Sequence, residues 1–156
     1  MRFLNAALLA TATLFAASSA IADANSDFLA ANAKKPGVKT AANGLQYKVL
    51  ATGKGMKPTK ADCVTVNYKG TFIDGRVFDQ SQPGQPISFP VTGVIAGWTE
   101  ALEMMHVGDK WELTLPSHLA YGESGTPDGT IPPNSPLVFQ VELLKTAPSQ
   151  MGRCPR

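Results

Sequence analysis

Apolar and polar residues alternate along four segments of the chain after Gly44. These segments are residues 45–49, 64–72, 111–115 and 137–143. A period of two places the apolar side chains on one face of a strand and the polar side chains on the other. Four such strands predict an antiparallel sheet with one buried face and one polar face.

One segment between these strands has the period of a helix instead. Trp98, Ala101, Leu102 and Met105 are spaced as i, i+3, i+4 and i+7, which forms a single apolar stripe. Gly108 follows as a candidate stop. The pattern predicts an α+β fold in which a curved antiparallel sheet, a half-barrel, wraps around one short helix. From its periodicity alone, Trp98 is a core residue.

The residues before the sheet predict a short helix and a linker. Ser26 is a suitable N-cap, and Lys34 and Lys35 suit the C-terminus of a helix over residues 26–35. Pro36-Gly37 would end this helix. Residues 36–43 then form a linker that ends at the turn signal Asn43-Gly44.

The first 22 residues have the features of a secretory signal. Arg2 gives a basic start, residues 3–15 are mostly apolar, and Ala20-Ile21-Ala22 fits an A-x-A cleavage site. A membrane anchor is the alternative, but the apolar run is short against the ~20 residues that span a bilayer. We therefore predict a periplasmic or secreted protein with no membrane span after cleavage.

This gives a division of the chain into four parts. Residues 1–22 are the signal peptide, 23–43 the short helix and linker, 44–145 the folded domain, and 146–156 a C-terminal tail. The net charge of +2 does not indicate a nucleic-acid partner or an anionic membrane surface.

The two cysteines, Cys63 and Cys154, have no spacing typical of a metal or redox motif. Export to an oxidising compartment makes a disulfide possible, and free thiols remain the alternative. Cys63 shares the parity of Thr65, so it should point away from the core, where the tail could reach it.

The usual catalytic sets are absent from the sequence. His106 and His118 lack metal-ligand spacing, and there is no G-x-S-x-G elbow or phosphate loop. We predict no metal and no cofactor. The sequence instead places aromatic and branched apolar residues beside turns, as in Phe78-Asp79, Val94-Ile95 and Tyr121-Gly122.

Five segments carry a family resemblance by their order and spacing. They are VTVNYKG (64–70), GRVFD (75–79), ISFPVTGVIAGWTEAL (87–102), VGDKWELTLPSHLAYGESG (107–125) and IPPNSPLVFQVELL (131–144). Together they resemble the FKBP-type peptidyl-prolyl cis-trans isomerases. Residues 28–50 are similar to the junction in macrophage-infectivity-potentiator-type members, where a helical dimerisation region precedes the domain. Only a stub of that region is present, which favours a monomer.

The resemblance implies a site and its ligands. The implied catalytic residues are Asp79, Tyr121 and Tyr68, and the implied substrate-binding residues are Phe78, Val94, Ile95, Trp98, Ile131 and Phe139. Trp98 would be the pocket floor, the Ile95 N–H and the Tyr121 hydroxyl would bind substrate carbonyls, and Tyr68 would bond to Asp79. The implied partners are proline-containing segments of exported proteins and macrolide-type inhibitors.

Two departures from the family pattern keep an alternative open. Residues 80–86 lack the arginine that often pairs with the aspartate, and Ile87 occupies a position that is often an aromatic wall. The alternative is a chaperone or peptide-binding module with the same fold and weak or no catalysis. A purely structural domain is a third hypothesis.

Overall fold

The computed structural model describes the backbone of residues 14–155, and the side chains from residue 19 onward. In chain order, the helices and strands are α1 (Leu14–Ala33), β1 (Val38–Thr40), β2 (Gln46–Ala51), β3 (Asp62–Phe72), β4 (Val77–Gln80), β5 (Ile87–Pro90), α2 (Ala96–Met104), β6 (Lys110–Leu115) and β7 (Leu137–Pro148). Two short 3-10 helices, Val91–Gly93 and Ser117–Leu119, precede α2 and follow β6.

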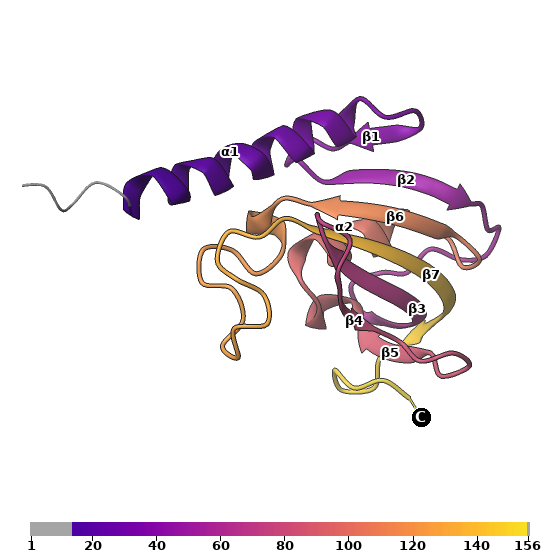
Figure 1. Ribbon diagram of the computed structural model, residues 1–156. Helices are drawn as coiled ribbons and strands as arrows, with labels where there is room; N and C mark the ends of the chain where they lie inside the picture. Colours follow the sequence, from indigo (N-terminus) through magenta and orange to yellow (C-terminus); the bar gives the residue numbers. More distant parts are fainter. Residues whose placement is uncertain (1–13, 156) are drawn as a thin grey trace, which may run out of the picture.

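All seven strands form one antiparallel sheet. Its order is β1-β2-β6-β7-β3-β4, and β5 pairs with β3 beside this path. The longest ladder joins β3 to β7, from Asp62 opposite Pro148 to Phe72 opposite Leu137. The sheet curves around α2 (Figure 1). The predicted fold, an antiparallel sheet around one short helix, is therefore confirmed.

The predicted apolar stripe of α2 forms the centre of the core. Trp98, Ala101, Leu102 and Met105 are each at most 4% exposed. They pack with the inward residues of β3, β6 and β7 in one hydrophobic cluster. The helix ends at Met104, because the backbone of Met105 is already extended (φ −76°, ψ 153°). The predicted stop at Gly108 therefore lies beyond the true end of the helix.

The N-terminal predictions need correction. α1 begins at Leu14 instead of at Ser26, and it ends at Ala33 instead of at Lys35. Residues 14–25 are rich in alanine and contain no glycine or proline, so nothing in them ends a helix. The predicted linker 36–43 contains a strand, β1, which pairs with β2.

Residues 1–13 of the predicted signal peptide lie outside the described residues. Among the described helices, none combines the length and the apolarity that crossing a membrane requires.

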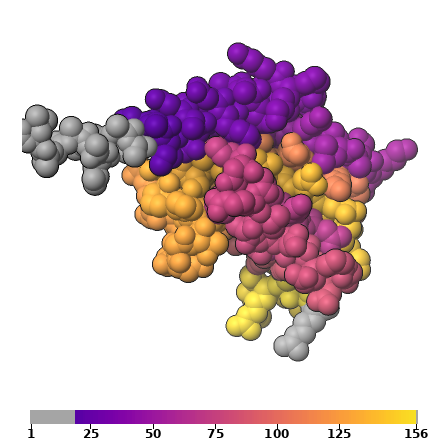
Figure 2. Space-filling view, in the orientation of Figure 1, coloured from indigo at the N-terminus to yellow at the C-terminus, as the bar shows by residue number. Residues whose placement is uncertain are grey.

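A buried polar cluster attaches α1 to the sheet. Asn32 of α1 donates to Gln46 of β2 at 2.7 Å and to Thr114 of β6 at 3.1 Å. All three side chains are at most 5% exposed. Figure 2 shows the loop between β6 and β7 lying beneath α1, where the Asn25 amide donates to the Asn134 carbonyl. α1 is thus packed against the sheet by specific hydrogen bonds.

The C-terminal tail is fastened to the sheet by a disulfide between Cys63 and Cys154, with Cα atoms 5.4 Å apart. β7 continues to Pro148, beyond the predicted domain end at residue 145, and the chain then turns back. The Ser149 N–H donates to the Ala61 carbonyl in this turn. Cys63 is buried and lies outside the core cluster. Of the two alternatives for the cysteines, the structure has the disulfide.

Candidate functional site

A pocket of about 400 Å³ opens between the concave side of the sheet and the start of α2. We call it the concave pocket. It is lined by Tyr68, Phe78, Asp79, Phe89, Gly93, Val94, Ile95, Trp98, Tyr121 and Phe139. These residues come from β3, β4, β5, β7, the start of α2 and the loop after β6. Most of them are aromatic or branched apolar side chains, so the pocket offers an apolar surface with few polar groups.

Trp98 is one of the two buried aromatic side chains of this pocket, with Phe139. Its ring lies edge-on to the rings of Tyr68 and Phe139, with centroids 5.4 Å away in both cases, and to that of Phe89 at 6.0 Å. Such edge-to-face packing fixes the ring before any ligand arrives. The buried indole N–H of Trp98 has no hydrogen-bond partner among the described residues. The structure therefore places Trp98 on the lining of the concave pocket, packed against three aromatic rings.

Gly70 of β3 permits the aromatic wall beside Trp98. A Cβ atom at this position would lie 2.6 Å from the Phe78 ring and 2.8 Å from the Phe139 ring. The two rings meet edge-on across the glycine, with centroids 5.6 Å apart. A larger residue at position 70 would separate them.

The polar groups of the concave pocket lie at its rim. The Tyr68 hydroxyl donates to Asp79 Oδ2 at 2.7 Å. Burial, this hydrogen bond and the nearby charge of Asp79 raise the pKa of Tyr68. Burial, followed by the charge of Asp79, also raises the pKa of Tyr121. Both phenols therefore keep their protons at neutral pH and can act as hydrogen-bond donors.

Asp79 has no cationic partner. Among the described residues, the ion pairs are Arg76 with Asp74 and a longer contact of His106 with Asp109. The arginine missing from residues 80–86 is thus not replaced from elsewhere in the described part of the fold. The Asp79 carboxylate instead accepts a hydrogen bond from the Tyr68 hydroxyl.

Eight of the nine residues predicted from the family resemblance line this one pocket. Ile131 does not. It is 3% exposed and lines a neighbouring hollow, which shares Phe78, Asp79 and Tyr121 with the pocket. Ile87 is also absent from the lining, and its side chain is 37% exposed.

Sequence reasoning missed two lining residues, Phe89 and Gly93. Phe89 lies opposite the buried Val64 in the pairing of β5 with β3, which turns its ring toward the core. β5 has only four residues, too few to show a clear alternation in the sequence. Had residues 87–90 been assigned as a strand, their alternation would have indicated which way the Phe89 side chain points.

The neighbouring hollow is bordered by a loop that Asp128 organises. Its carboxylate accepts hydrogen bonds from the Thr126 hydroxyl at 2.7 Å, and from the hydroxyl and the N–H of Thr130 at 2.8 and 3.0 Å. These bonds stabilise the charged form and lower the pKa of Asp128 to about 2. The loop therefore presents a negative charge to the hollow that Asp79 also lines.

The described residues contain no group of three or more His, Cys, Asp or Glu side chains that could hold a metal ion. His118 is engaged with the carbonyl of Asn43 at 2.8 Å. The arrangement in the concave pocket suits binding and desolvation of a ligand more than covalent catalysis, because its lining residues include no serine, threonine, cysteine or lysine nucleophile.

Comparison with known proteins gives the family. A model described as "FKBP-type peptidyl-prolyl cis-trans isomerase" matches residues 54–144. A second, "Domain amino terminal to FKBP-type peptidyl-prolyl isomerase", matches residues 5–49. Together these two matches cover both the sheet domain and α1.

Individual relatives agree with these matches. The chain is 58% identical over 118 residues to the peptidyl-prolyl cis-trans isomerase Mip of Coxiella burnetii, which covers 75% of this chain and 51% of that protein. It is 55% identical over 119 residues to the FKBP-type 22 kDa peptidyl-prolyl cis-trans isomerase of Escherichia coli, covering 76% and 57%. It is 49% identical over 118 residues to a Legionella longbeachae protein named outer membrane protein MIP, covering 75% and 50%. The chain thus spans about half the length of the curated relatives it matches.

A solved structure agrees with the fold as well. The crystal structure of a peptidyl-prolyl cis-trans isomerase from Pseudomonas syringae pv. tomato superimposes with a TM-score of 0.78 at 43% identity, covering 83% of this chain and 96% of that one. Since the family model alone accounts for more than half of the chain, this protein belongs to the FKBP-type peptidyl-prolyl cis-trans isomerase family.

Proposed function

We propose that this protein is a peptidyl-prolyl cis-trans isomerase that accelerates rotation about X-Pro bonds. The observation that carries this proposal is the concave pocket itself, with Trp98 packed against aromatic rings, apolar walls and polar groups only at the rim. Such a site fits a reaction in which no bond breaks and no proton moves.

The reaction requires only rotation about one peptide bond. Rotation about a peptide bond has a barrier of ~18–20 kcal/mol, and uncatalysed X-Pro isomerisation takes tens to hundreds of seconds. The transition state is a twisted amide that has lost resonance and therefore part of its charge separation. A desolvated apolar pocket binds this less polar state better than the planar ground state, which lowers the barrier.

The rim groups orient the substrate. Ile95 is the N-cap residue of α2, so the helix provides no acceptor for its N–H, which can bind a substrate carbonyl. The Tyr121 hydroxyl supplies a second donor, and Asp79, held by Tyr68, lies beside the amide that rotates. Bonds of about 1 kcal/mol each fix a short peptide loosely. Phe78, Val94 and Phe139 then enclose the proline ring, and Ile131 contacts the residues beside it.

The substrates in this proposal are proline-containing segments of exported proteins, and macrolide-type inhibitors compete for the same pocket. Export is supported by the N-terminal signal pattern and by the Cys63–Cys154 disulfide, which is typical of oxidising compartments. One chain contains the whole site, so the proposal requires no partner subunit.

The test is a protease-coupled assay on Xaa-Pro peptides with the mature chain. Asp79→Ala and Tyr68→Phe each remove one end of the hydrogen bond at the rim, and we expect kcat/KM to fall about tenfold in each, the effect of ~1.4 kcal/mol. Asp27→Ala, an exposed carboxylate on α1, is the matched control and should leave the rate unchanged. A folded wild-type chain that does not exceed the uncatalysed rate would overturn the proposal.

A second candidate function follows from the unpaired Asp79. Without a cation beside it, the site could bind apolar segments and release them without useful catalysis, as a chaperone does. This candidate predicts that Asp79→Ala still suppresses the aggregation of an unfolded client. It fails if the variant loses holding activity together with isomerase activity.

A further inference from the structure

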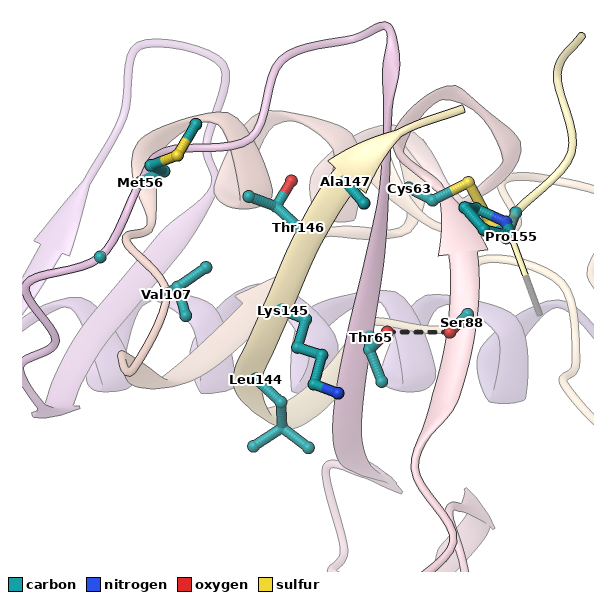
Figure 3. Close-up of a pocket in the computed structure, with 12 residues that line it drawn as sticks. Met56, Cys63, Thr65, Ser88, Val107, Leu144, Lys145, Thr146, Ala147 and Pro155 are labelled. Atoms are coloured by element: carbon teal, nitrogen blue, oxygen red, sulfur yellow. Dashed lines mark hydrogen bonds between the residues drawn. A yellow bond between two sulfur atoms is a disulfide. The ribbon is translucent and has the colours of Figure 1, made fainter. Parts of the chain in front are cut away.

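A second hollow, of about 530 Å³, lies over the C-terminal end of β7, away from the concave pocket. We call it the outer groove. In Figure 3 its floor is the stretch from Leu144 to Ala147, with Met56 and Val107 on one side of the strand and the cysteine bridge on the other. Its volume lies within the usual range of ligand sites.

The wall at the disulfide is on the polar face of the sheet. Cys63 and Thr65 alternate along β3 with the fully buried Val64 and Val66. The Thr65 hydroxyl is paired with that of Ser88 at 2.9 Å, so this wall is hydrogen-bonded within itself. The outer groove therefore opens on the face opposite to the core and shares no lining residue with the concave pocket.

Both walls are held in place by defined contacts. On one side, the Gly55 N–H donates to the Val107 carbonyl and the Val107 N–H donates to the Met56 carbonyl, both at 3.0 Å. On the other side, the disulfide brings Cys154 and Pro155 against Cys63, which is 91 residues earlier in the chain. The part of the second wall that Cys154 and Pro155 form is therefore joined to the sheet by one covalent bond.

The groove combines an apolar surface with positive charge. Lys145 is the one charged residue among those that line it. Lys54, Lys57 and Arg153 each adjoin a lining residue in the sequence. None of these four cations forms an ion pair with another described residue. Asp62 is the acidic neighbour, and its carboxylate accepts hydrogen bonds from Thr59.

We propose that the outer groove is a second binding site, which takes extended peptide segments with apolar residues flanked by aspartate or glutamate. The apolar side chains would enter between Met56 and Val107 on one side and the disulfide on the other. The flanking carboxylates would meet Lys145 and the cations that adjoin the lining residues in the sequence, which gives charge complementarity. Because the groove is recessed, an inserted peptide side chain can fill it better than a flat lipid surface can. This proposal does not depend on the isomerase activity.

The probe is a fluorescein-labelled, proline-free peptide with a central run of leucines between pairs of glutamates, and binding to the mature chain is measured by fluorescence anisotropy. We expect Met56→Asp and Lys145→Glu each to weaken binding about tenfold. Both side chains are exposed, so neither substitution disturbs the core. The double variant Cys63→Ser/Cys154→Ser should weaken binding at least as much, because it releases one wall.

Matched controls separate this site from general effects. Leu50→Asp and Lys39→Glu change exposed residues of β2 and β1 away from the groove, and should not alter binding. The isomerase rate of Met56→Asp and Lys145→Glu should equal that of the wild type, so failure of one proposal is distinguishable from failure of the other.

Five outcomes would overturn the proposal. Four concern peptides: no binding of the probe, binding that the groove variants leave unchanged, displacement of the probe by a peptide that occupies the concave pocket, and equal binding of a peptide with lysines in place of the glutamates. The fifth is binding to anionic lipid vesicles without binding to the peptide, which would indicate a membrane contact.

Discussion

The two hollows of this protein differ in how deeply their lining side chains are buried. The concave pocket is formed largely by side chains that belong to the core or pack against it, and two of them, Trp98 and Phe139, are only 4% exposed. The outer groove is bordered by exposed Met56 and Lys145, and one of its walls is fastened by the Cys63–Cys154 disulfide. One hollow is therefore part of the folded core, and the other is added to the surface of the sheet.

This difference determines how each hollow can change. Substitution of a side chain in the concave pocket changes both the packing of the core and the binding site, because the same side chains contribute to both. Substitution of Met56 or Lys145 at the outer groove replaces exposed atoms, which usually changes stability by less than about 0.5 kcal/mol. The comparison predicts that stability and binding are coupled on the concave side, and that on the outer side they are separable everywhere except at the disulfide.

The strongest test of this coupling is Trp98→Ala. Trp98 is in edge contact with three aromatic rings, and its loss leaves a cavity in the core. We expect the free energy of unfolding to fall by about 4 kcal/mol, the usual cost of such a truncation. Urea denaturation followed by circular dichroism measures it. Met56→Ala, at a side chain 75% exposed, is the control on the outer side and should leave stability unchanged.

The isomerase assay completes this test. Trp98→Phe keeps an aromatic ring at the floor and should retain the fold while lowering kcat/KM, because the smaller ring fills the floor less completely. A Trp98→Ala chain as stable as the wild type would contradict the view that the concave pocket is part of the core.

The disulfide provides the next largest effect, on the outer side. The bridge joins residues 91 positions apart, so it restricts the unfolded chain strongly. We expect Cys63→Ser/Cys154→Ser to lower the free energy of unfolding by about 3 kcal/mol. Urea denaturation again measures it. The isomerase kcat/KM should stay at the wild-type value, because neither cysteine lines the concave pocket.

A double variant that loses kcat/KM as well as stability would show that the two faces of the sheet are coupled. Single serine variants are unsuitable as controls, because each leaves a free thiol. The wild type under reducing conditions is the better control and should match the double variant.

The concave pocket was more accessible to sequence reasoning than the outer groove. The α2 stripe is visible in the spacing of Trp98, Ala101 and Leu102, and the order of the five family segments brought in the rim residues. Phe89 was missed because a four-residue strand shows no clear period in the sequence. Ile131 was assigned to the concave pocket although it lines a neighbouring hollow, because the geometry of the loop after Tyr121 cannot be derived from sequence spacing.

The outer groove depends on contacts that local patterns do not contain. The parity of Cys63 predicted the correct face, but the pairing with Cys154 depends on how the tail turns back after Pro148. The predictions for the N-terminal region were also wrong. The alanine-rich residues upstream of Ser26 favour a helix, but the prediction began the helix at the candidate N-cap Ser26. The strand β1 depends on its pairing with β2, which no local pattern contains.

The smallest effect concerns the rim of the concave side. Three hydrogen bonds from Thr126 and Thr130 hold the Asp128 carboxylate, which lowers its pKa to about 2. Because the folded value lies below the unfolded one of about 3.9, these bonds contribute stability above that pH and lose it as the pH falls through about 2. Carboxyl NMR should therefore show Asp128 titrating near 2. In Thr126→Val, which removes one donor, the pKa should rise toward the ordinary value, while kcat/KM between pH 6 and 9 stays unchanged, because Asp128 is ionised throughout that range. An Asp128 that titrates at the ordinary value in the wild type would mean that these bonds do not persist in solution and that the loop beside Asp79 is not held as the structure shows.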